Sequence, residues 1–412
     1  MSQDPLRFAL IGCGGIAKAH LNAVEDLKRR GIADLVFTAV CDSNEDNARS
    51  TAEDIEKRFG VRPAVYFDYR KLLESEKIDA ADLCLPHGLH HGVAIDCLEA
   101  GAHVICEKPL GVTIAASRKM VEASKRTGKL IATAVPYRRL PGQRAVRWAL
   151  AESGLIGRPL SFFHQYTRPG RPRQRPANAP VPPALAWRLD RLMSGGGMVM
   201  DSGFHYCDSM RYFLGEPEKV YAEARGLQSG EPIKLGEGRE DTVFVTFTFK
   251  SGVVGTWAWS LSAPGESIGN VVFYGSDGSI RDTTPSGALI FHLFWRNPPN
   301  VMEDGTLTRG SGEIMSLAEL EKMHLDKIGD LQEELFPRGC TDGFGIEIYD
   351  FTEAIRGRRE KPEVDAQGGL LSLAVCESVY ESAISGEPVL YDDVVSGKRA
   401  AYQKMVDEHW GL

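Results

Sequence analysis

A lysine stands just beyond the end of an apolar run, at a place where its charge could take part in chemistry. The run His103–Cys106 has the composition of a β-strand, and Glu107, Lys108 and Pro109 come next. Burying a lysine costs solvation free energy unless its charge is used, and proline cannot donate a hydrogen bond to a sheet. The strand must therefore end here, and the pattern predicts that Lys108 stands at its carboxyl end.

A second polar set follows a run of three glycines in "SGGGMVMDSGFHYCDSM". If residues 198–214 form a helix, Asp201, His205 and Asp208 share one face, because they are spaced i, i+4 and i+7. The spacing alone favours an ordinary solvated face. Two features favour a chemical role instead: the face carries Asp and His rather than a Lys/Glu mixture, and the glycines would let the backbone pass close to a ligand.

The segment "FALIGCGGIAKAH" contains a glycine-rich loop between an apolar run and a helical pattern. Glycines at such a turn let the backbone approach a pyrophosphate, and the helix N-terminus supplies free N–H groups. A tight strand–helix turn without a ligand would fit the motif equally well. Its position at the start of a strand–helix–strand unit favours a dinucleotide, with contacts from Gly12, Gly14, Gly15, Ile16 and Ala17.

The second predicted strand, Leu35–Cys41, is followed by Asp42. A carboxylate at this place can accept hydrogen bonds from the adenosine ribose hydroxyls and would repel a 2′-phosphate. Asp42 therefore favours NAD over NADP. The alternative is that Asp42 only caps the next helix.

The first 136 residues alternate strand-like and helix-like segments, which indicates a parallel sheet covered on both faces. The expected strands are Arg7–Ile11, Leu35–Cys41, Ala64–Phe67, Ala80–Leu85, His103–Cys106 and Leu130–Val135; the expected helices are Ile16–Arg29, Glu45–Phe59, Gly92–Ala100 and Ala115–Thr127.

From residue 137 strand-like runs dominate, with helical stretches at 343–356 and 366–385. The predicted fold class is α/β: a Rossmann-type doubly wound parallel sheet for dinucleotide binding in residues 1–136, then an α+β domain with a large, mostly antiparallel open sheet in 137–412. We expect the second domain to bind substrate and to form the oligomer contact, because strands such as "VFVTFTFK" are apolar on both sides.

Composition narrows the class of protein further. The chain has 412 residues and a formal net charge of −8, which argues against a nucleic-acid partner. Eight cysteines without a CxxC pair indicate a reducing compartment, and there is no signal-peptide region or long apolar run, so we expect a cytoplasmic protein without a membrane partner. No metal site is expected, since His90 and His91 lack a second ligand cluster. Trp257 and Trp259 are expected to be packing residues, and His20 a structural one.

The stretch 168–188 contains many arginines and prolines, so it cannot form a regular strand or helix. We rank a solvated loop first, an arm on a neighbouring subunit second, and a lid that touches substrate third. Arg188 is the best candidate for a substrate contact.

Three motifs in order, "GCGGIA", "LPHGLHHGVAIDCLEAGAHVICEKPLG" and "GGGMVMDSGFHYCD", resemble the Gfo/Idh/MocA family of sugar and polyol oxidoreductases. The resemblance covers the first domain and the core of the second. It implies an NAD-dependent dehydrogenase that acts on a sugar, polyol or related cyclic alcohol, as a homo-oligomer.

The resemblance also assigns residues. Lys108 matches the lysine of the EKP motif, which lies beside the nicotinamide and the reacting hydroxyl, and the Lys108–Pro109 bond is expected to be cis. Asp201 and His205 match the D-x-x-x-H pair. His87 replaces the asparagine that many members carry after the proline. The expected cofactor contacts in this region are Pro86, His87, His90, Glu107 and Lys108, and the expected substrate contacts are Lys108, Arg188, Asp201 and His205.

The expected mechanism uses His205 as general base, Asp201 to orient it or relay the proton, and Lys108 to hold the substrate oxygen. Two other functions stay open: a sensor that binds NAD without turnover, and an enzyme that retains NAD and uses transient oxidation for elimination or glycoside cleavage. The presence of all three residues favours the enzyme.

Overall fold

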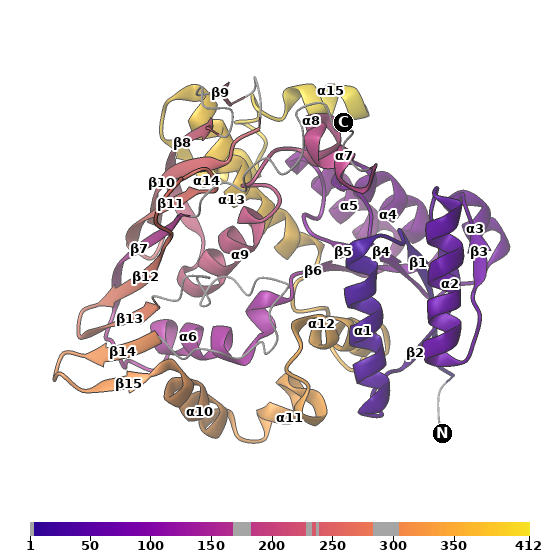
Figure 1. The fold of residues 1–412 in the computed structure, drawn as a ribbon, viewed down its shortest axis with the longest axis horizontal. Coiled ribbons are helices and arrows are strands. Elements are labelled where there is room, and N and C mark those ends of the chain that lie inside the picture. Colours follow the sequence, from indigo (N-terminus) through magenta and orange to yellow (C-terminus); the bar gives the residue numbers. More distant parts are fainter. Residues whose placement is uncertain (1–3, 168–182, 228–232, 236–238, 283–304) are drawn as a thin grey trace. The chain divides into compact units, whose positions relative to one another are not determined.

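The computed structural model describes residues 4–167, 183–227, 233–235, 239–282 and 305–412 (Figure 1). These residues form two compact units. The first unit contains residues 1–139 and 332–371 with residue 412, and the second contains 140–331 and 372–411. Our sequence-based division at residue 136 assigned 332–371 to the second domain, whereas the structure groups this stretch with the first unit. Residues 168–182 of the Arg/Pro-rich stretch and the strand-like run "ALIFHLFW" at 288–295 lie outside the described residues. The described end of the Arg/Pro-rich stretch is helical, over Pro183–Ala186 and Trp187–Leu189, so the expectation that it cannot form a regular helix is wrong there.

A six-stranded sheet forms the centre of the first unit (Figure 1). All of its strand pairs are parallel, and the order β3-β2-β1-β4-β5-β6 is that of a Rossmann fold. The predicted parallel sheet is therefore confirmed. The strands are β1 (Leu6–Ile11), β2 (Leu35–Cys41), β3 (Ala64–Tyr66), β4 (Ala80–Leu83), β5 (His103–Glu107) and β6 (Ile131–Ala134).

Local capping explains where several helices of this unit begin and end. Asn44 and Thr113 accept backbone N–H bonds at the N-termini of α2 and α5, and Gly60 and Gly128 end these helices in the left-handed conformation. Five of the helices are predicted from the sequence, and the short α3 and α11 are not. The helices are α1 (Gly15–Arg29), α2 (Glu45–Phe59), α3 (Tyr69–Ser75), α4 (His90–Glu99), α5 (Ile114–Thr127), α11 (Leu331–Leu335) and α12 (Gly343–Ile355).

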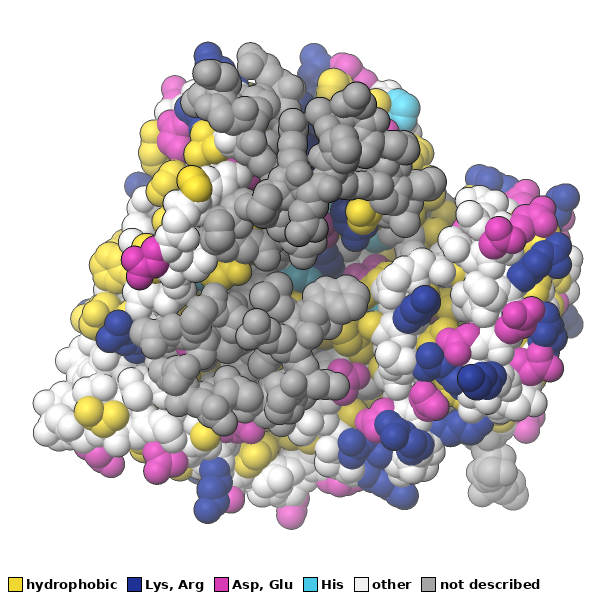
Figure 2. Space-filling view, viewed as in Figure 1, with side chains coloured by type: hydrophobic (Ala, Val, Ile, Leu, Met, Phe, Trp, Pro, Cys, Tyr) yellow, Lys and Arg dark blue, Asp and Glu magenta, His cyan; other side chains and the backbone are white. Residues whose placement is uncertain are grey.

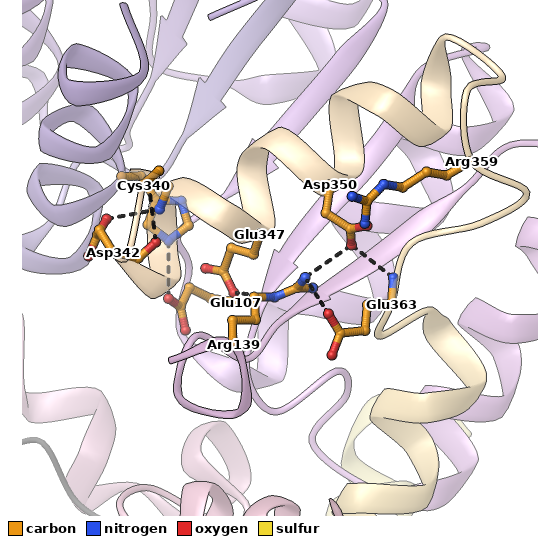
Figure 3. A network of polar contacts seen from close by, with 10 residues as sticks. Glu107, Arg139, Cys340, Asp342, Glu347, Asp350, Arg359 and Glu363 are labelled. Atoms are coloured by element: carbon orange, nitrogen blue, oxygen red, sulfur yellow. Dashed lines mark hydrogen bonds and ion pairs between the residues drawn. The ribbon is translucent and has the colours of Figure 1, made fainter. Parts of the chain in front are cut away.

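A buried ion network explains why residues 332–371 belong to the first unit. The Arg139 guanidinium is fully buried and lies 3.1 Å from Asp350 and 3.2 Å from Glu363 (Figure 3). Asp350 also pairs with Arg359 at 2.6 Å. Removing one partner of a buried ion pair typically costs about 3–5 kcal/mol, so this network holds the late stretch to the N-terminal fold. The ring contact Phe8–Phe351, at 6.1 Å, adds apolar packing.

A ten-stranded sheet forms the second unit, and it confirms the predicted large, mostly antiparallel sheet. Nine strands follow the order β15-β14-β13-β12-β7-β11-β10-β8-β16, and β9 pairs with β8. The pair β7–β11 is parallel and the other pairs are antiparallel. The strands are β7 (Pro159–Thr167), β8 (Pro217–Gly226), β9 (Ile233–Lys234), β10 (Thr242–Phe249), β11 (Val254–Ser260), β12 (Ile268–Gly275), β13 (Gly278–Asp282), β14 (Gly305–Arg309), β15 (Ile314–Ser316) and β16 (Val389–Leu390).

One face of this sheet is buried against helices of the same unit. Tyr206 of α9 (Gly203–Leu214) packs against Trp257 with ring centroids 4.3 Å apart, and Phe213 contacts Phe273. Trp257 and Trp259 are both buried, so the prediction that they are packing residues is confirmed. The other helices are α6 (Pro141–Ala151), α7 (Pro183–Ala186), α8 (Arg191–Ser194), α10 (Leu317–Ile328), α13 (Ala366–Ser385, which begins in the first unit), α14 (Tyr391–Val395) and α15 (Lys404–Trp410).

The opposite face of the sheet carries exposed apolar side chains. The register of β8, β10, β11, β7 and β12 places alternate residues of each strand on this face. Phe244 is 60% exposed and Phe163 is 48% exposed. The exposed apolar residues on this face are Tyr221, Phe244, Val254, Phe163, Ile268 and Tyr274. Among the described helices, none is both long and apolar enough to cross a lipid bilayer.

A buried histidine on the covered face predicts a pH-dependent stability. His164 of β7 stacks on Tyr206 at 4.8 Å, and burial lowers its pKa to about 3. An unfolded histidine has a pKa of about 6.5, so the unfolded state binds the extra proton between these values. Stability is retained above pH 6.5 and lost as the pH falls toward 3.

We expect His164→Phe to flatten this dependence by up to about 1.4 kcal/mol per pH unit within that window. Chemical denaturation of wild type and variant at several pH values measures the slope of the unfolding free energy. Exchange of the exposed His409 for Gln is the control and should leave the slope unchanged. Equal slopes in wild type and His164→Phe would contradict the assignment.

Candidate active site

The glycine loop after β1 combines one constrained glycine with two open ones. Gly12 has φ +92°, and a Cβ there would lie 2.3 Å from the carbonyl oxygen of Cys84, so a side chain cannot be accommodated. Gly14 and Gly15 are exposed, and a Cβ at either would meet no atom within 4 Å. Gly14 precedes α1 without a side-chain cap. The first amides of α1 therefore border open space, which fits a pyrophosphate.

Asp42 lies beside this loop, at the end of β2. Its two carboxylate oxygens accept the backbone N–H groups of Cys13 and Asn44, each at 2.8 Å. The capping of α2 is done by Asn44, not by Asp42. The alternative that Asp42 is merely the helix cap is therefore wrong, because the side chain of Asn44 holds that position.

The loops after β4 and β5 are tied together by His90. Its ring nitrogens lie 2.8 Å from the Pro109 carbonyl oxygen and 2.9 Å from that of Leu85. His87 belongs to the 3₁₀ turn His87–Leu89, is buried, and has its ring centroid 5.9 Å from that of His90. Both nitrogens of His90 thus have partners within the protein, and its ring fixes the shape of this edge of the sheet.

Lys108 follows β5 as predicted, and Glu107 holds its backbone. The Glu107 carboxylate accepts the Lys108 amide N–H at 2.9 Å through one oxygen, and its other oxygen lies 3.2 Å from Nε2 of His20. The Lys108–Pro109 bond is cis, which confirms that prediction. Lys108 is half-buried. The carboxyl ends of β1, β2, β4 and β5 thus meet at one edge of the sheet, where open parallel sheets bind ligands.

In the second unit, α9 begins at Gly203, so the predicted helical start at 198 is wrong and Asp201 lies in the preceding turn. Two distant residues divert the chain there. The Glu240 carboxylate accepts the N–H groups of Gly197 and Val199, and the Tyr380 hydroxyl accepts those of Gly197 and Met200. Because these amides donate to side chains, they are not available for the backbone hydrogen bonds of a regular helix.

The glycines before this turn make room for the same two side chains. A Cβ at Gly196 would lie 2.3 Å from the Tyr380 hydroxyl, and one at Gly197 would lie 2.5 Å from the Glu240 carboxylate. Close packing by the protein itself therefore accounts for these two glycines, rather than the approach of a ligand that we expected. Sequence reasoning missed Glu240 and Tyr380, because nothing in their local pattern points to the glycine run.

The polar residues around α9 differ in their surroundings. Asp208 is fully buried and accepts a hydrogen bond from the Ser372 hydroxyl at 2.6 Å, so its face is not solvated. His205 is also buried, at 4% exposure. Asp201 is partly exposed and pairs with the Nε of Arg188 at 3.2 Å. The structure thus brings together Arg188 and Asp201, two of the predicted substrate contacts.

Comparisons with known proteins agree with this arrangement. A family model described as an oxidoreductase family with an NAD-binding Rossmann fold matches residues 6–135, and a GFO/IDH/MocA C-terminal domain model matches residues 145–281. Myo-inositol 2-dehydrogenase of Thermotoga maritima is 31% identical over 68% of this chain and 77% of its own. Levoglucosan dehydrogenase of Pseudarthrobacter phenanthrenivorans is 31% identical over 67% and 73%.

A solved structure is similar over nearly the whole chain. The WlbA dehydrogenase from Bordetella pertussis, in complex with NADH and UDP-GlcNAcA, superposes with a TM-score of 0.70 at 23% identity, covering 95% of this chain and 99% of that one. At this identity the likeness concerns the fold.

The parallel sheet, its open glycine loop and the two family matches define a dinucleotide-binding oxidoreductase. The chain belongs to the Gfo/Idh/MocA family of oxidoreductases, and its cofactor is NAD. The predicted family, fold class, cofactor and enzyme class are confirmed.

The constrained glycine and the exposed glycines of the loop predict different effects of substitution by alanine. Gly12→Ala should lower the free energy of unfolding by about 1–3 kcal/mol, because the new Cβ meets Cys84 and φ is unfavourable. Gly14→Ala should leave stability unchanged but weaken NAD binding by about tenfold or more, because its Cβ enters the space assigned to the pyrophosphate.

Thermal unfolding and NAD titration of the purified variants separate the two effects. Gly92→Ala, in α4, is the matched control, since its Cβ also meets no atom within 4 Å. Unchanged NAD affinity in Gly14→Ala would show that the pyrophosphate lies elsewhere.

Proposed function

We propose that this protein transfers a hydride between a CH–OH group of a sugar, polyol or related cyclic alcohol and NAD. The observation that carries the proposal is the position of Lys108 at the end of β5, on the sheet edge that also carries the open glycine loop. The relatives named above support the substrate class, since they are dehydrogenases of myo-inositol and levoglucosan. The names of these relatives do not support the two alternative functions, a sensor that binds NAD without turnover and an enzyme that retains NAD for elimination or glycoside cleavage.

NAD, when bound, supplies the hydride acceptor. The backbone of Gly12, Gly14, Gly15, Ile16 and Ala17 holds its pyrophosphate, and Asp42 accepts hydrogen bonds from ribose hydroxyls. The Asp42 carboxylate, which accepts the backbone N–H groups of Cys13 and Asn44, would repel a 2′-phosphate. Pro86 and His87 line the nicotinamide side, while His90 and Glu107 act by shaping the backbone around it.

Each candidate catalytic residue has a separate role in the proposal. Lys108 donates a hydrogen bond to the substrate oxygen and stabilises the charge that develops as the hydroxyl proton leaves. His205 takes that proton as general base, and Asp201 orients it or relays the proton. Arg188, paired with Asp201, holds a further substrate hydroxyl. In the reverse direction the same groups return the proton to a carbonyl.

Surface charge and cysteine chemistry support a small-molecule enzyme of the cytoplasm. On the described residues seen in Figure 2, Lys/Arg and Asp/Glu side chains are interspersed, without a continuous basic surface. All eight cysteines are free and buried, which suits a reducing compartment. We propose no nucleic-acid or membrane partner.

The proposed roles predict that Lys108→Ala and His205→Ala keep the fold and NAD binding but lose turnover. We expect kcat to fall on the order of a hundredfold, the usual contribution of a positioned acid or base. NADH formation across a panel of sugars, cyclitols and glycosides measures turnover, and NAD titration with thermal unfolding verifies the fold. Lys125→Ala, at an exposed position of α5, is the control.

Near wild-type turnover in Lys108→Ala would overturn its assignment. A wild-type protein that binds NAD but remains inactive on every panel substrate would favour the sensor. Single-turnover assays on substrate-loaded enzyme detect catalysis without net NADH.

We further propose that the exposed face of the ten-stranded sheet is a contact between copies of this chain. Six large apolar residues lie exposed on one face of five adjacent strands, and contiguous apolar surface of this kind marks interfaces. A second copy would present the same face and cover it symmetrically.

Phe244→Glu should therefore shift the protein toward monomer, because the new carboxylate would be buried in the contact without a partner. Light scattering at micromolar concentration measures the mass. Val61→Glu introduces the same charge at a 49% exposed position of the first unit and should have no effect. A wild-type protein with monomeric mass would disprove the interface.

A further inference from the structure

His20, on α1, is fully buried between carboxylates from two strands. Its Nδ1 lies 3.0 Å from both carboxylate oxygens of Asp82 on β4, and its Nε2 lies 3.2 Å from Glu107 at the end of β5. Both carboxylates are themselves buried, at 2% and 6% exposure. A single imidazole thus joins the nucleotide-loop helix to two strand ends.

The contact with Glu107 continues to Lys108. One Glu107 oxygen faces His20, and the other accepts the Lys108 backbone N–H at 2.9 Å. Each Glu107 oxygen therefore has its own partner, and the two contacts together restrain how the carboxylate can turn. A change at His20 therefore frees Glu107 to turn, and with it the backbone that presents Lys108.

The charge of the His20 imidazole strengthens its contacts with the two carboxylates. Burial by itself lowers the pKa of His20, but the Asp82 carboxylate outweighs it and holds that pKa well above its usual value. Other groups near the ring are Asp342, which caps the N-terminus of α12, and Phe344 and Glu347 of α12. The Phe344 ring centroid lies 5.6 Å from that of His20, and burial raises the pKa of Glu347 well above its usual value. The imidazolium is thus the cation that faces both Asp82 and Glu107.

We propose that His20 is a positioning residue for catalysis, which fixes Glu107 and through it the orientation of Lys108. The inference rests on the role proposed for Lys108. His20 touches neither substrate nor cofactor in this proposal. It acts by keeping the Glu107 carboxylate in the rotamer that binds the Lys108 amide, and it does so while it is charged.

A metal site is the competing interpretation of the same cluster. Ligand atoms of His20, Asp82 and Cys84 lie within 4.8 Å of one another. Three observations oppose it. Both ring nitrogens of His20 already face carboxylates, burial and Asp82 raise the pKa of the Cys84 thiol so that it stays protonated, and the described residues offer three ligands where a structural zinc takes four.

The test compares single and double variants of the full-length enzyme. His20→Gln keeps a donor toward Glu107 but removes the charge. We expect kcat to fall roughly tenfold to a hundredfold with NAD affinity retained, since small misplacement of a catalytic group has effects of this size. His103→Gln, at the other end of β5, is the matched control and should keep the wild-type rate.

Adding His20→Gln to Lys108→Ala should not lower the residual rate further, because His20 acts through Lys108. An equal loss in both backgrounds would show a merely structural role and overturn the inference, as would a wild-type rate in His20→Gln alone. If Lys108→Ala itself retains full turnover, the proposed function fails instead, so the two failures are distinguishable.

Asp82→Asn provides a test that does not depend on losing the imidazole. Because the raised pKa of His20 depends on Asp82, the imidazolium of the variant should be lost at lower pH. The alkaline limb of the kcat profile should therefore move to lower pH than in the wild type. An unmoved limb would contradict the proposal, and so would stoichiometric zinc that is present in the wild type and lost in Cys84→Ser.

Discussion

Charges buried at the end of a parallel sheet must be compensated within the protein, and the first unit is organised around this requirement. Asp82 and Glu107 end adjacent strands, β4 and β5, where water is excluded from both carboxylates. An isolated buried carboxylate would be strongly unfavourable, so the imidazole of His20 lies between them. Because His20 belongs to α1, the same compensation fixes the helix that carries the glycine loop against the strand that presents Lys108.

Buried charges are also compensated between residues that are far apart in the chain. Figure 3 shows Arg139 joined to Asp350 and Glu363, acids that α12 and its following loop supply. This network is why acids 211 and 224 positions after Arg139 belong to the unit of the Rossmann strands. The NAD-binding fold of this protein is therefore completed by sequence that a linear division assigns to another domain.

In the second unit, buried polar side chains are compensated by hydrogen bonds from backbone amides. Glu240 and Tyr380 are buried and satisfied by amides of the glycine run, and the Tyr380 hydroxyl donates to Glu240 at 2.8 Å. The turn that results places Asp201 outside α9 and beside Arg188. Candidate catalytic residues are thus positioned by side chains that take no part in the proposed chemistry.

Local patterns in the sequence were enough to predict the six parallel strands, the glycine loop, Asp42 and the placement of Lys108, because strand periodicity, glycine and proline act over a few neighbouring residues. Tertiary structure alone decided the start of α9, the purpose of the glycines before it and the partners of His20. These depend on contacts between residues that are tens to hundreds of positions apart, such as Gly197 with Tyr380, and local patterns contain no record of which distant side chain will fill a given space.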